Sequence, residues 1–198
     1  MIHKLWYASL VLEFCGLIAL DWRKWPYFAL WLAFDVITGA VNVWLDHEHR
    51  KMYASAFAIK QPIAILLRAF AAQEVWKKLH GPVWARTCVG ISAFIVLART
   101  HSWPHTLMEA EFAGIAACTA ALGIILWLSL QAAMKLTTDP VILNHGYVMC
   151  GYFLLFSVCY FAAWGYRETM GRATGIVACI AYGTWFVLAV KQRKRHRA

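Results

Sequence analysis

Three charged residues lie near the middle of long apolar stretches: Glu13, Asp35 and Arg68. A charge inside an apolar segment is costly unless it is paired or lines a wet cavity. If successive segments alternate in direction, the three side chains reach a similar depth, where Arg68 can hold the carboxylate of Glu13 or Asp35 through charge-assisted hydrogen bonds. The pattern predicts either a buried ion pair that fixes helix register or a site for a proton, an ion or a small polar ligand.

Further polar residues extend this site along two helices. Trp31, Thr38 and Asn42 share one helical face with Asp35. Gln61 precedes Arg68 by one heptad, and Glu74 lies further along the same segment. The predicted midplane set therefore comprises Glu13, Asp35, Asn42, Gln61, Arg68 and Glu74.

Seven apolar segments are available to position these side chains. A helix of about 20 apolar residues crosses the roughly 30 Å of bilayer hydrocarbon. Only 15% of the residues are charged and the mean hydropathy is +0.56, whereas soluble proteins average about 25% charged residues. The sequence thus predicts an all-α polytopic membrane protein, in which residues 1–198 form one seven-helix transmembrane bundle ending in a basic tail at 191–198. The expected helices cover residues 3–20, 25–45, 54–76, 83–99, 107–134, 141–164 and 172–190.

The distribution of Lys and Arg predicts the orientation. Basic residues are more frequent on the side that carries the C-terminal tail, so the positive-inside rule places the N-terminus outside and the C-terminus in the cytoplasm. The net charge of +9 is then explained by anionic lipids at the cytoplasmic tail, and no nucleic acid is needed. The expected location is the inner (plasma) membrane of a bacterial cell.

Small residues recur every four positions in the last segment. Gly171, Gly175, Cys179 and Gly183 form a stripe that allows another helix backbone to approach closely. The stripe predicts a helix-packing face, which is used either inside the bundle or toward a membrane-protein partner or a second copy of the chain.

Histidine and carboxylate side chains gather in the expected outer loops, where Asp46 to His49 form the second loop. Such groups suit a borderline divalent metal such as zinc or nickel. Their spacing matches no strong metal motif, and exposed loop polarity explains them more simply. No cofactor is predicted, and no catalytic motif is visible, so the chain is expected not to be an enzyme. The weak metal candidates are His47, His49, His101, His105 and Glu109.

Three stretches carry a family resemblance. They are the turn from Arg23 to Phe28, the segment from Arg68 to Trp76 that ends in Gln-Glu-Val-Trp, and the fifth segment beginning near Glu111. Together they resemble a family of small, uncharacterised seven-helix membrane proteins of bacteria. The resemblance implies a fold and no activity.

Two function classes follow from these observations. The first is a non-catalytic membrane subunit or sensor, which docks partners through the last helix and the basic tail. The alternative is a small transporter or channel for a proton, an ion or a small solute, using the midplane charges.

Overall fold

A computed structural model describes residues 2–48, 50–79, 108–134, 139–162 and 167–195. Within these ranges every regular element is an α-helix. The predicted segment 83–99 lies outside the described residues, so the structure describes six of the seven expected helices. These are α1 (Ile2–Ala19), α2 (Pro26–Glu48), α3 (Arg50–Lys78), α5 (Met108–Ala133), α6 (Pro140–Ala162) and α7 (Arg167–Arg195).

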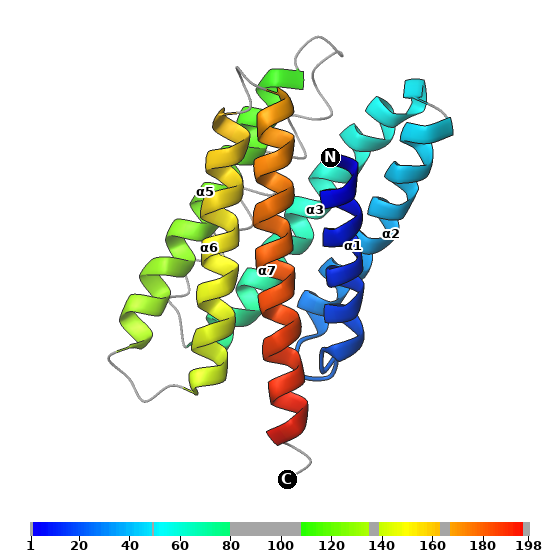
Figure 1. Ribbon diagram of the computed structural model, residues 1–198. Helices are drawn as coiled ribbons and strands as arrows, with labels where there is room; N and C mark the ends of the chain where they lie inside the picture. The colour runs from blue at the N-terminus through cyan, green and yellow to red at the C-terminus, as the bar shows by residue number, and fades with distance from the viewer. Residues whose placement is uncertain (1, 49, 80–107, 135–138, 163–166, 196–198) are drawn as a thin grey trace.

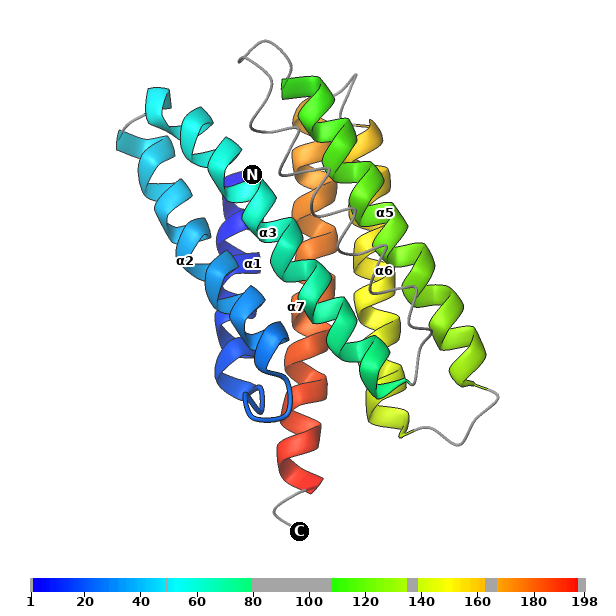
Figure 2. The same ribbon diagram turned by 180° about the vertical axis from the view of Figure 1, so that it is seen from behind.

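The six helices form a closed ring. α1 contacts α2, α2 contacts α3, and α3 contacts both α5 and α6, while α6 contacts α7 and α7 returns to α1. In Figure 1, α7 crosses the front of the bundle, and α1, α3, α5 and α7 descend while α2 and α6 ascend. The view from behind shows α3 running obliquely between α2 and the α5–α6 pair (Figure 2). Side chains from α1, α2, α3, α6 and α7 can therefore meet in the interior of the ring.

The ascending helices begin with the same local signal. Asp139 accepts a hydrogen bond from the Val141 N–H at 2.9 Å, and Pro140 is the first helical residue of α6. At the start of α2, Asp21 organises the preceding turn and Pro26 opens the helix. Proline suits the first helical position because its missing N–H would have no intrahelical acceptor there. A proline thus opens both helices, Asp139 caps α6, and Asp21 holds the turn that precedes α2.

Helices extend into two stretches where the sequence predicts a loop and a tail. The residues from Asp46 to Glu48 were expected in a loop but continue α2, and α3 begins at Arg50. α7 starts at Arg167 and ends at Arg195, so most of the predicted basic tail is helical. Neither stretch contains Gly or Pro, and polar residues end an apolar run without ending a helix.

The surface of the bundle is strongly apolar. Within the part of the chain that the structure describes, three helices contain segments long and apolar enough to cross a membrane: Pro26–Leu45, Pro140–Cys159 and Ala173–Gln192. Large hydrophobic side chains point outward from several helices, whereas soluble proteins rarely expose contiguous apolar patches of this kind. They include Val11, Phe14 and Ile18 on α1, Ile37 on α2, Val158 on α6, and Ile176, Ile180 and Val187 on α7.

The small-residue stripe of α7 faces α1 within the same chain. A Cβ added at Gly175 would lie 3.2 Å from the Leu5 Cβ, and Cys179 Sγ lies 3.4 Å from the Leu5 carbonyl oxygen. At Gly183 the corresponding contact, with Leu12 Cδ1, would be an ordinary 3.8 Å. Gly171 belongs to α7, but its surroundings lie outside the described residues. The close approach is therefore concentrated at Gly175.

Replacing Gly175 with Leu should lower the stability of the bundle. The new side chain would push α1 away at a Cβ that cannot move independently of its backbone, at a cost of about 1–3 kcal/mol, as is typical of overpacking. Gly151→Leu is the matched control, because a Cβ at Gly151 meets nothing within 4 Å. Thermal unfolding in mild detergent measures both variants. Equal destabilisation of the two would contradict the assigned α1–α7 contact.

Candidate functional site

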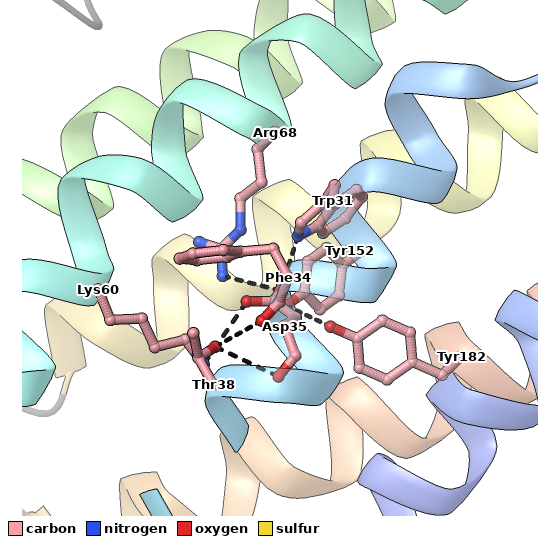
Figure 3. A network of polar contacts seen from close by, with 8 residues as sticks. All are labelled: Trp31, Phe34, Asp35, Thr38, Lys60, Arg68, Tyr152 and Tyr182. Carbon is pink, nitrogen blue, oxygen red and sulfur yellow. Dashed lines mark hydrogen bonds and ion pairs between the residues drawn. The ribbon is translucent and has the colours of Figure 1, made fainter. Parts of the chain in front are cut away.

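Asp35 on α2 lies at the centre of a buried polar cluster (Figure 3). Its Oδ2 accepts a 2.6 Å hydrogen bond from Trp31 Nε1, one turn earlier on the same helix. Two cations of α3 approach the same carboxylate: Lys60 Nζ lies 3.5 Å from Oδ1, and Arg68 Nη2 lies 4.0 Å from Oδ2. The Lys60 contact is an ion pair without hydrogen-bond geometry, since Oδ1 accepts no hydrogen bond from the described residues.

Aromatic rings surround the Arg68 guanidinium. Its Cζ lies 4.7 Å from the ring centroid of Phe156, 5.9 Å from that of Trp31 and 6.0 Å from that of Tyr152. A guanidinium within about 6 Å of a ring face is attracted by the π electrons. The ion-pair distance to Asp35 exceeds the roughly 2.7–2.9 Å of a charge-assisted hydrogen bond. Aromatic ring faces and Asp35 therefore both stabilise the buried positive charge of Arg68.

Glu13 on α1 is a second buried carboxyl next to this cluster. It is 4% exposed, and its Oε1 has no hydrogen-bond partner within the part of the chain that the structure describes. Asp35, Lys60 and Arg68 are its charged neighbours, and the Tyr182 hydroxyl lies beside it. That hydroxyl in turn lies 3.4 Å from the Tyr152 hydroxyl. Ionisable groups of α1, α2, α3, α6 and α7 thus converge on one interior region.

The structure separates Glu74 from the other predicted midplane residues. Its Oε2 accepts a 3.2 Å hydrogen bond from the Phe28 N–H, in the first turn of α2. That position lies about two helical turns before Asp35. A carboxylate at a helix N-terminus satisfies a backbone N–H and interacts favourably with the helix dipole. Glu74 therefore joins α3 to the start of α2. The side chains of Asn42 and Gln61 lie outside the described residues.

A buried aromatic group fills the space between this cap and Asp35. His145 on α6 packs against Trp25, Phe28 and Trp185, with ring centroids 4.3, 4.5 and 6.1 Å away. Its Nε2 is buried without a hydrogen-bond partner among the described groups. Trp185 also packs edge-on against Trp31 at 5.6 Å, so this aromatic group supports the residue that hydrogen-bonds Asp35.

Sequence reasoning missed three members of the cluster. Lys60 is a further charge inside an expected helix, and its position about two turns before Arg68 was the available signal. Tyr152 and Tyr182 gave no such signal, because only the packing of α6 on α7 brings these two residues together.

The weak metal candidates are not brought together by the described parts of the chain. His49, His101 and His105 lie outside them, as do the side chains of His47 and Glu109. Among the residues that were placed, no group of three or more His, Cys, Asp or Glu side chains has the arrangement of a metal site.

No family model, curated protein or solved structure matches this chain. What the site does must therefore be argued from its own chemistry. Two cations and two carboxyls in an apolar interior can hold a charged or polar solute, exchange a proton, or fix the helices by ion pairing.

Breaking the Asp35–Arg68 pair should cost more than removing it. Arg68→Met leaves Lys60 as the one cation of this cluster beside Asp35. Buried pairs that lose one partner are generally destabilised by about 3–5 kcal/mol. The double variant Asp35→Asn/Arg68→Met should regain a large part of this loss. A double-mutant cycle on the free energy of unfolding measures the coupling. Additive effects of the two substitutions would show that the residues do not interact.

Proposed function

We propose that the chain is a multi-pass integral membrane protein that binds or conducts a proton, an ion or a small polar solute at the Asp35 cluster. One observation carries this proposal: charged and hydroxyl groups of five helices meet around Asp35 in the interior of a bundle whose exterior is apolar. Ionisable residues inside membrane segments are costly, and they commonly mark ion and substrate pathways.

The alternative of a membrane subunit or sensor has less support from the packing. The stripe containing Gly175 and Cys179 already contacts α1, so it is engaged within the chain. Support for docking then comes from the basic end of α7, which projects past the neighbouring helices (Figure 1). Lys191 is exposed there and begins a basic helical turn suited to anionic lipid or an acidic partner.

The orientation in the membrane is inferred from the position of the basic residues. We propose an N-out, C-in orientation in the inner membrane of a bacterial cell, because the basic end of α7 favours the cytoplasmic side. The family resemblance of the Arg23–Phe28 turn agrees with a seven-helix fold and adds no activity.

A reporter fused after Ala198 should lie in the cytoplasm, so only a reporter that works in the cytoplasm should be active. Paired fusions to an enzyme that folds in the periplasm and to a protein that fluoresces in the cytoplasm measure the side directly. Activity of the periplasmic reporter would overturn the proposed orientation while leaving the helix bundle unaffected.

Proteoliposomes should conduct protons or another small ion faster than protein-free vesicles. The flux should fall at least about tenfold in Asp35→Asn, because the two cations of α3 would lose their counter-ion and repel each other in a low-dielectric interior. A trapped pH dye records proton flux, and trapped ion indicators record sodium, potassium and chloride. Glu74→Gln is the matched carboxylate control, since its amide oxygen can still accept the Phe28 N–H bond.

The two variants separate a functional site from a structural one. Both must first elute as the wild type does in detergent and retain its helical circular dichroism. If wild-type vesicles show no flux of any of these ions above the protein-free background, the transport proposal fails and the cluster is structural.

A further inference from the structure

We propose that Glu13 is the residue of this cluster that takes up and releases a proton, while Asp35 remains the permanent counter-ion of the α3 cations. This inference rests on the proposed function and narrows it to proton exchange. In the exchange, the Glu13 carboxylate gains a proton from water that enters the bundle and later returns it, and no other bond changes.

The two buried carboxyls have very different surroundings. Asp35 has an indole N–H donor at 2.6 Å and two cations within 4.0 Å, so a donor or an opposite charge faces it from three directions, although its Oδ1 accepts no hydrogen bond from the described residues. Hydrogen bonds and opposite charges both favour the ionised form of a carboxyl group. Asp35 therefore has the contacts that a buried carboxylate anion needs.

Glu13 has fewer partners than Asp35. Among the described residues Glu13 forms no ion pair, its Oε1 is buried without a hydrogen-bond partner, and the Tyr182 hydroxyl is the hydrogen-bonding group beside it. An ionised carboxylate without a partner is expensive in an apolar interior, and the neutral acid costs far less. A buried polar atom with no partner also requires an explanation, which a proton or an entering water supplies.

Groups of both charge signs face Glu13. α1 packs against α2 and α7, which contribute Asp35 and Tyr182, and behind them α3 contributes two cations. The cations favour the carboxylate, whereas burial and the negative charge of Asp35 favour the acid. Counting Lys60, Arg68 and Asp35 as charged, the group carries +1 when Glu13 is neutral and zero when Glu13 is ionised. Proton loss from Glu13 thus neutralises the cluster.

Labelling with dicyclohexylcarbodiimide tests this assignment. This apolar reagent adds to a protonated carboxyl group to give an O-acylisourea. The O-acylisourea then rearranges to a stable N-acylurea on the same residue. In wild-type protein reconstituted in vesicles, peptide mass spectrometry should find Glu13 labelled at least about tenfold faster than Asp35, with the Glu13 rate falling as the pH rises. Asp35→Asn should leave Glu13 reactive, whereas Glu13→Gln should abolish labelling at this site.

A second readout guards against a reagent that fails to reach the site. Infrared difference spectra between acidic and alkaline pH should contain a protonated-carboxyl C=O band that disappears in Glu13→Gln and persists in Glu74→Gln. Preferential labelling of Asp35, or a C=O band that is lost in Asp35→Asn and retained in Glu13→Gln, would overturn the assignment. Absence of both Glu13 labelling and the Glu13 band would also overturn it.

This inference and the proposed transport function can fail independently of each other. Labelling and infrared bands report protonation without requiring transport. Proton exchange at Glu13 in a protein that conducts nothing would therefore leave this inference intact and contradict the transport proposal. Proton flux without any Glu13 labelling or Glu13 infrared band would contradict this inference and leave the transport proposal intact.

Discussion

The burial of the Asp35 carboxylate constrains the rest of the bundle. A negative charge in an apolar interior requires opposite charge and hydrogen-bond donors, and these come from Trp31 on its own helix and from Lys60 and Arg68 on α3. The two cations of α3 thereby fix the register of α3 against α2, while the Trp31 hydrogen bond holds the Asp35 side chain on its own helix. Glu74 accepts a hydrogen bond from the Phe28 N–H, so polar contacts join the two helices at the start of α2 and again near its middle.

Packing around this centre follows from the same constraint. Arg68 needs polarisable neighbours, and Trp31, Tyr152 and Phe156 supply ring faces, which draws α6 against α3. Trp185 of α7 then packs on Trp31, and Gly175 lets α1 approach α7 closely enough to place Glu13 beside Tyr182. The polar cluster is thus enclosed in a largely apolar and aromatic core, while large apolar side chains also cover much of the outside of the bundle.

The helical architecture and the importance of Asp35 and Arg68 could be predicted from the sequence. The length of an apolar segment and a charged residue inside it are both visible in the local sequence. Asp35 and Arg68 do contact each other, as the midplane hypothesis requires. Glu74 could not be assigned to a helix cap in advance, because its acceptor role depends on where α2 begins relative to α3. The same holds for Tyr182, which reaches Glu13 only through the packing of α7 on α1. The predicted loop from Asp46 to Glu48 is wrong because polarity was taken as a helix end where no helix-breaking residue occurs.

The most direct test of the central claim is the separation of Arg68 and Asp35 in a lipid bilayer. Solid-state NMR on protein labelled with ¹⁵N-arginine and ¹³C-aspartate measures the dipolar coupling between guanidinium nitrogens and carboxylate carbons, and an Asp35→Asn sample identifies the contribution of this pair. The account predicts a coupling consistent with the 4.0 Å contact between Nη2 and Oδ2, together with a carboxylate chemical shift typical of an ionised group. A signal unchanged by Asp35→Asn, or a shift typical of a protonated acid at neutral pH, would contradict it.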